Sequence, residues 1–81
     1  MITEEERSFL KMYRCHGYTA GKGFLWKNIL HIIDQYLSPP AVKRWPDILD
    51  SLIAKGYIQL NKNSFYVLTK EGEKEAYDQL I

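Results

Sequence analysis

The sequence WPDILDSLIAKGYIQLNKNSFYVL, residues 45–68, decides the fold of this chain. Its first half repeats apolar residues at the spacing of an α-helix, and Pro46 fits because a proline in the first helical turn has no hydrogen bond to lose. Gly56 tolerates the left-handed conformation that often ends a helix. We therefore expect a helix from about residue 44 to residue 55. Its buried side chains should be Trp45, Ile48, Leu49, Leu52 and Ile53, with Arg44, Asp47, Asp50, Ser51 and Ala54 facing outward.

The second half of this stretch predicts a β-hairpin. The runs 57–60 and 64–68 are β-prone, and Asn61-Lys62-Asn63 between them is a short connection of the hairpin kind. Thr69 then caps a last helix, which is expected from Lys70 to about Leu80. Its apolar positions are Ala76, Tyr77 and Leu80.

Two more helices are expected before this stretch. Thr3-Glu4-Glu5-Glu6 fits a capping box, which predicts a helix from about Thr3 to Cys15. Three glycines mark 17–23 as a loop. A further helix from about Phe24 to Leu37 should end at Ser38-Pro39-Pro40, because a residue before proline is driven out of the α conformation. Its wide apolar stripe, typical of a helix packed between two neighbours, contains Trp26, Ile29, Leu30, Ile33, Tyr36 and Leu37.

Length and composition place these elements in one small domain spanning 1–81, with 46% apolar and 26% charged residues. The order helix-helix-helix-strand-strand-helix predicts a mainly α protein with a small β-hairpin, of the α+β class. No apolar run approaches the ~20 residues that span a bilayer. The acidic start also lacks the basic segment of an export signal, and the single Cys15 cannot form an internal disulfide. We therefore expect a cytoplasmic protein without membrane contact.

Two segments resemble a known family. Leu49-x-x-Leu52-x-x-x-Gly56-Tyr57-Ile58, which leads from a helix into a hairpin, resembles the winged helix-turn-helix fold. Tyr66-Val67-Leu68-Thr69-x-x-Gly72 is similar to the strand-to-helix exit of the MarR- and PadR-like transcriptional regulators. The resemblance extends from about residue 45 to residue 77 and is compatible with residues 2–37.

The resemblance implies a transcriptional regulator that binds double-stranded DNA. In the DNA-binding members, the helix that here spans about 44–55 lies in the major groove, and the hairpin, or wing, contacts phosphates. The charge distribution agrees: from Lys11 to Lys62, eight basic and three acidic residues leave a net charge of +5, against +1 for the whole chain. The residues to which these roles would fall are Lys43, Arg44, Asp47 and Ser51 on the helix, Lys62 at the wing tip and Lys27 on the preceding helix.

Three features depart from the DNA-binding members of this fold, and the alternative is a winged-helix adaptor that binds protein and not DNA. The connection from Ser38 to Lys43 is longer than the usual turn and holds two prolines. Asp47 and Asp50 place negative charge where phosphates would approach, which suits a basic protein partner. The wing has a single basic residue, Lys62. Both hypotheses stay open, because a fold does not fix a function.

No catalytic, metal or cofactor site is expected, so the chain is predicted not to be an enzyme. Gly17-x-x-x-Gly21-Lys22-Gly23 has the wrong spacing for a phosphate-binding loop and lacks the hydroxyl after the lysine. Cys15, His16 and His31 do not show the spacing of a zinc site. Trp26 and Trp45 both fall on apolar helix stripes, so core packing is the favoured interpretation for each.

A weak homodimer is a further hypothesis, because proteins that read palindromic DNA are usually dimers. The terminal helices, Ile2–Cys15 and Lys70–Ile81, are the surfaces that this chain offers. Within the second of them, the expected contact residues are Tyr77, Leu80 and Ile81.

Overall fold

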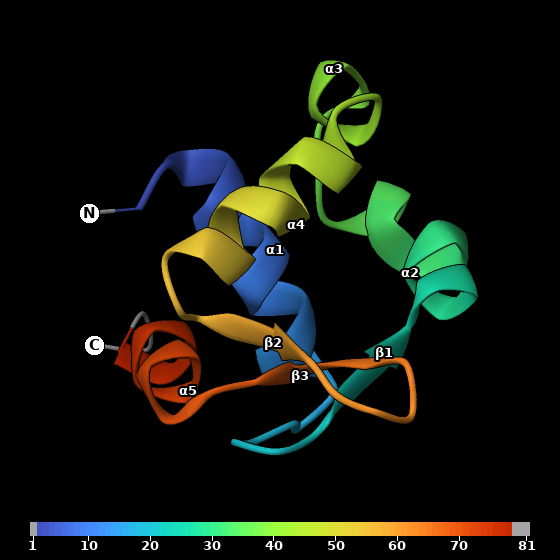
Figure 1. The fold of residues 1–81 in the computed structure, drawn as a ribbon. Coiled ribbons are helices and arrows are strands. Elements are labelled where there is room, and N and C mark those ends of the chain that lie inside the picture. The colour runs from blue at the N-terminus through green and yellow to red at the C-terminus, as the bar shows by residue number, and fades with distance from the viewer. Residues whose placement is uncertain (1, 79–81) are drawn as a thin grey trace.

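Helices and three short strands make up the computed structural model, which describes residues 2–78 (Figure 1). The fold is a compact α+β fold, mainly helical, which confirms the expected class at that level. The predictions for residues beyond 78, namely the end of the last helix near Leu80 and the contacts of Leu80 and Ile81, lie outside the described residues. In chain order the elements are α1 (Glu4–Cys15), β1 (Gly23–Leu25), α2 (Trp26–Ile32), the 3-10 helix η1 (Ile33–Gln35), α3 (Pro39–Val42), α4 (Trp45–Ala54), β2 (Ile58–Leu60), β3 (Phe65–Leu68) and α5 (Lys70–Asp78).

Local sequence signals are confirmed at the ends of α1 and α4. Thr3 forms the capping box with Glu6 in both directions, so the backbone N–H groups of Thr3 and Glu6 each have a partner at the start of α1. Helix α4 starts at Trp45, one residue after the expected earliest start, and Gly56 beyond its end has a φ of +82°. Only glycine adopts this backbone region without strain, so Gly56 turns the chain into β2.

The hairpin is present, but it belongs to a three-stranded antiparallel sheet in the order β1-β3-β2. Strand β1 differs from the expectation: the sequence predicts that Phe24 and Leu25 begin a helix, and this prediction is wrong. Phe24 pairs with Tyr66 of β3 and is buried, so pairing with a distant strand outweighs the local helical pattern. The hairpin turn itself is held by Asn61, whose side-chain oxygen accepts the backbone N–H groups of Asn63 and Phe65.

The expected helix 24–37 is accordingly shorter and less buried. It is divided into α2 and η1. Ile29 and Ile33 are buried as expected, whereas Trp26 is 42% exposed and Leu30 is 52% exposed. The interpretation of this segment as a helix packed between two neighbours, with Trp26 in the core, is therefore wrong.

The connection 38–43 also differs from the expectation, because it contains the one-turn helix α3. Pro39 and Pro40 occupy its first two positions, where a missing N–H costs nothing, and Ala41 is buried. The two prolines that predicted a break therefore start a helix.

The core is centred on α1, which packs against both α4 and α5. Tyr13 of α1 is fully buried, and its hydroxyl donates a hydrogen bond of 2.7 Å to the carbonyl oxygen of Tyr66 in β3. Gly72 lets α5 approach the chain before β2, and the Thr69 hydroxyl accepts the Gly72 N–H as the expected cap. Among residues 2–78, no helix has the length and apolar character needed to cross a membrane.

Candidate functional site

Arg44, one of the expected DNA contacts, is paired with a carboxylate of its own chain. Its guanidinium forms a salt bridge with Glu5 of α1, and its Nε lies 3.5 Å from the carbonyl oxygen of Pro40. The two side chains are 55% and 35% exposed, so water screens the pair and its contribution to stability is small. The pairing nevertheless directs the guanidinium toward α1.

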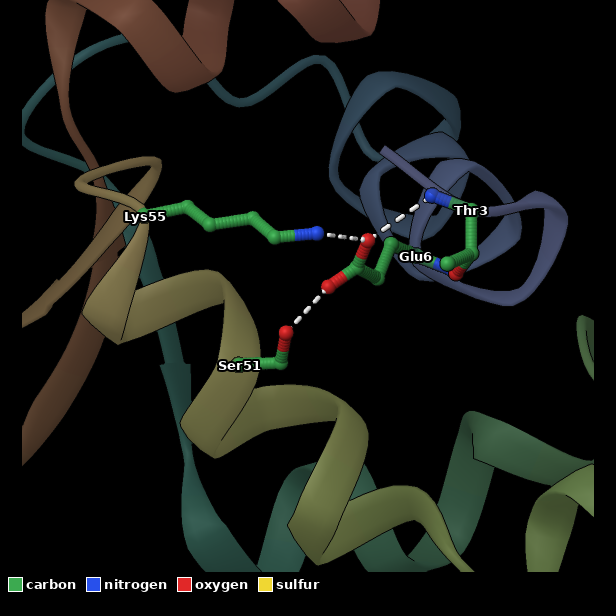
Figure 2. A network of polar contacts seen from close by, with 4 residues as sticks. All are labelled: Thr3, Glu6, Ser51 and Lys55. Atoms are coloured by element: carbon green, nitrogen blue, oxygen red, sulfur yellow. Dashed lines mark hydrogen bonds and ion pairs between the residues drawn. The ribbon is translucent and has the colours of Figure 1, made fainter. Parts of the chain in front are cut away.

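Ser51 is also directed inward, so the prediction that it faces outward is wrong. Its hydroxyl donates a hydrogen bond of 2.5 Å to one carboxylate oxygen of Glu6 (Figure 2). The other carboxylate oxygen accepts the Thr3 N–H at 2.8 Å and the Lys55 ammonium at 2.7 Å. Ser51 is therefore part of a contact between α1 and α4.

Glu6 is the centre of this network, and its side chain is only 3% exposed. Burial alone would raise the pKa of this carboxyl. The hydrogen bonds from Lys55, Ser51 and the Thr3 backbone, together with the Lys55 charge, outweigh burial and lower the pKa from 4.5 to about 2. Glu6 is thus ionised at neutral pH and is fully occupied within the chain.

The outward face of α4 retains acidic side chains and no basic one. Asp47, Asp50 and Ala54 are the exposed residues within the helix, at the spacing of a single face. The shallow hollow beside this face, between α4 and the start of α1, has three carboxylates against one guanidinium, and so it disfavours a phosphate. Its lining residues are Thr3, Glu5, Glu6, Arg44, Asp47, Ile48 and Ser51.

The other expected basic contacts are exposed. Lys43 precedes α4, Lys27 lies in the first turn of α2, and Lys62 lies in the turn between β2 and β3. No salt bridge is formed by these three lysines among residues 2–78. They come from three different elements, so no single helix face presents them together.

A groove beside Lys27, here called the aromatic groove, was not expected from the sequence. It has a volume of about 360 Å³ and lies where α2 meets the hairpin. The Trp26 ring lies 4.4 Å from the Trp45 ring and 6.0 Å from the Tyr66 ring, measured between centroids. A tryptophan at the start of a helix next to a lysine was the available signal, but the apolar stripe favoured burial. The lining residues are Leu25, Trp26, Lys27, Leu60, Ser64 and Tyr66.

The remaining residues considered for chemistry have structural contacts. His16 places Nδ1 2.9 Å from the Met12 carbonyl oxygen, and its ring packs edge-on against Phe24. Cys15 is exposed, and burial together with the neighbouring Cys15 raises the pKa of Tyr36. Within residues 2–78, no group of three or more histidine, cysteine, aspartate or glutamate side chains is placed to hold a metal ion.

The surface expected for a homodimer is partly used within the chain. Helix α5 packs against α1, and the Tyr77 hydroxyl donates to the carbonyl oxygen of Tyr18 at 2.6 Å. The homodimer therefore stays a prediction. Comparison of the chain with known protein families, with curated proteins and with solved structures gave no match, so the resemblance to winged-helix regulators also stays a prediction.

Proposed function

We propose that this chain is a winged-helix domain that binds another protein and not DNA. The winged-helix part is supported by the succession of α4, a hairpin and α5, and by a first strand, β1, that pairs with β3 of the hairpin. In such a domain α4 would be the helix that enters the major groove of DNA. The chemistry of α4 therefore decides between the two partners.

The observation that carries the proposal is the charge on the outward face of α4. Asp47 and Asp50 are exposed there, while the neighbouring bases Arg44 and Lys55 are paired with Glu5 and Glu6 of α1. Specific and non-specific DNA binding both depend on Lys and Arg side chains that neutralise phosphates. A helix that presents carboxylates in their place repels the DNA backbone and tolerates a protein.

The first experiment measures binding of a fluorescent 25-base-pair random duplex at 50 mM salt by anisotropy. We expect no binding by the wild type, and we expect Asp47→Lys/Asp50→Lys to gain a Kd of about 10⁻⁴–10⁻⁶ M, the range of non-specific DNA binding. The control Asp34→Lys/Glu71→Lys makes the same charge change at exposed positions outside α4. Duplex binding by the wild type would overturn the proposal. An equal gain in duplex affinity by both double variants would show that the charge of α4 has no special role in excluding DNA.

The second experiment asks directly for a protein partner. A photo-crosslinking amino acid is placed at Asp47 on α4, at Leu60 in the aromatic groove, or at the exposed control position Glu71 on α5. The proposal expects one discrete, nuclease-resistant protein adduct from position 47 or 60 and none from position 71. Adducts that nuclease removes, or equal labelling at all three positions, would contradict it.

A second candidate function is DNA binding through the exposed lysines, and it is favoured by Lys27, Lys43 and Lys62 having no salt bridge among residues 2–78. Three phosphate contacts would give a slope of log K against log salt of about −2.7. Lys62→Ala should then reduce the slope by about one, whereas Arg44→Ala should have little effect because its guanidinium is held by Glu5. This pattern in a duplex titration would favour DNA over protein.

A further inference from the structure

We propose that the aromatic groove binds a short segment of a partner protein that carries one bulky apolar side chain beside one or two carboxylates. This inference rests on the proposed function insofar as the partner is a protein, and it adds the site and the chemistry of the partner. The groove is open on the surface between the start of α2 and the end of the hairpin.

The floor of the groove is aromatic and already arranged for binding. Trp26 packs on Trp45, which is only 5% exposed, and also lies near Tyr66. Contacts on both neighbours restrict the Trp26 ring, so binding orders few further side chains and loses little conformational entropy. Trp and Tyr are the residues most often found at the energetic centres of protein interfaces.

The apolar wall explains why a protein side chain would enter. Leu60 is 51% exposed and Trp26 is 42% exposed, although both are large apolar residues of a small domain. Covering them removes apolar surface from water, which is the main favourable term in association. The volume of about 360 Å³ is near the lower end of the range of ligand pockets, roughly 300–1,000 Å³, so the groove suits one large side chain.

The charge of the groove determines which residues of the partner would flank its apolar side chain. Lys27 is the charged residue that lines it, and no acidic side chain is found among its described lining residues. Lys62 is two residues from both Leu60 and Ser64, which line the hairpin side. A carboxylate next to the apolar anchor would reach Lys27 at the edge of the groove, where complementary charge contributes mainly to specificity and association rate.

The same features favour a peptide over single-stranded nucleic acid. Proteins that bind a strand without sequence preference combine several stacking platforms with a basic track along the backbone. Here one lysine lines the groove, and the aliphatic Leu60 that also lines it complements an apolar side chain better than a base. The groove therefore has room for one apolar anchor of a partner and bases for one or two of its carboxylates.

The test uses the full chain as bait for a phage-displayed library of random 12-residue peptides. We expect enriched peptides to share an aromatic or leucine residue within two positions of Asp or Glu. A synthetic peptide from this set should shift Trp26 emission to the blue on binding. Leu60→Ser and Lys27→Glu should each weaken its Kd at least tenfold. The matched controls Phe65→Ser and Lys22→Glu, which alter a separate hollow on the other face of the sheet, should bind as the wild type does.

Each alternative has its own outcome. Enriched peptides that lack carboxylates, or that bind Lys27→Glu normally, would overturn the charge part of the proposal, and normal binding by Leu60→Ser would overturn the site. Tighter binding of a 12-nucleotide oligothymidylate than of any peptide would assign the groove to nucleic acid. Self-association that light scattering detects and Leu60→Ser removes would assign it to a second copy. A crosslinked partner at position 47 but not at position 60 would leave the proposed function intact and refute only this inference.

Discussion

Replacing Glu6 with glutamine tests how much the contact between α1 and α4 contributes to stability. The substitution keeps the size of the side chain and one acceptor oxygen. It removes the negative charge and one of the two carboxylate oxygens, which accept hydrogen bonds from Lys55 and Ser51. Lys55 is 35% exposed and can turn toward water, so the variant should fold. Its cost is then the lost stabilisation of a buried carboxylate, and not the burial of an unpaired ammonium.

The magnitude follows from the pKa of Glu6, which is lowered from 4.5 to about 2. At about 1.4 kcal/mol for each pKa unit, ionised Glu6 contributes about 3 kcal/mol to the free energy of unfolding at neutral pH. A lowered pKa means that this contribution is complete above pH 4.5 and is lost as the pH falls toward 2. Glu6→Gln should therefore lower the free energy of unfolding by about 2–3 kcal/mol at pH 7, a large part of the usual 5–15 kcal/mol.

Urea unfolding followed by tryptophan fluorescence at pH 7, 5, 4, 3 and 2 measures this difference. The curves of wild type and Glu6→Gln should be far apart at pH 7 and should converge between pH 5 and pH 2. Glu71→Gln, which changes an exposed carboxylate on α5, is the matched control and should follow the wild type throughout. A gap between Glu6→Gln and wild type that stays constant with pH would refute the argument, because the ionised carboxylate would then not be the source of the stability.

Three further substitutions test the fold. Gly56→Val should cost about 1–2 kcal/mol in urea unfolding, because the φ of +82° is strained for a residue with a β-carbon, and wild-type stability would place the end of α4 elsewhere. Gly72→Ala should lower the melting temperature by more than Gly56→Val does, because its β-carbon would lie 1.9 Å from the Tyr57 carbonyl oxygen; a smaller drop would contradict the close approach. Tyr13→Phe should cost about 1–3 kcal/mol, since the Tyr66 carbonyl oxygen loses its 2.7 Å donor, and unchanged stability would mean that water replaces it.

Elements with local start and stop signals could be predicted from the sequence. The Thr3 capping box and Gly56 fix one end each of α1 and α4 through contacts within a few residues. The Asn61 turn is equally local, since its side chain holds the two backbone groups that close the hairpin. Signals of this kind need no knowledge of the rest of the fold, which is why these boundaries agree to within about two residues.

Strand β1 could not be predicted, because the residues of β3 with which it pairs are 40 to 44 positions further along the chain. The sequence predicts that Gly23 belongs to a loop with two other glycines, but a β-carbon there would lie 1.8 Å from the Tyr66 carbonyl oxygen. The glycine is therefore needed for close approach of β1 to β3. The apolar periodicity of 24–37 gives no indication that Phe24 pairs with Tyr66 and leaves Trp26 at the surface.

The sequence also could not predict which basic residues are paired within the chain, because their acidic partners are distant in the sequence. Glu5 and Glu6 at the start of α1 are about 40 to 50 residues from Arg44 and Lys55 at the ends of α4. In the sequence the two acids therefore belong to an acidic N-terminus, and the two bases belong to a basic central segment. Folding brings Glu5 to Arg44 and Glu6 to Lys55, so two bases of the apparent DNA-binding segment are neutralised by residues outside it. A net charge counted along a sequence thus overestimates the charge that a surface presents.

That neutralisation also determines which surface remains for a partner. With Arg44 and Lys55 held by α1, the exposed side of α4 presents Asp47 and Asp50, and the exposed bases are dispersed over other elements. The exposed side chains of Trp26 in α2 and Leu60 in β2 line the aromatic groove together with one of those bases, Lys27. Since apolar burial and a single charge suffice to hold a peptide anchor, whereas DNA requires several free cations on one face, this surface supports the proposal of a protein partner.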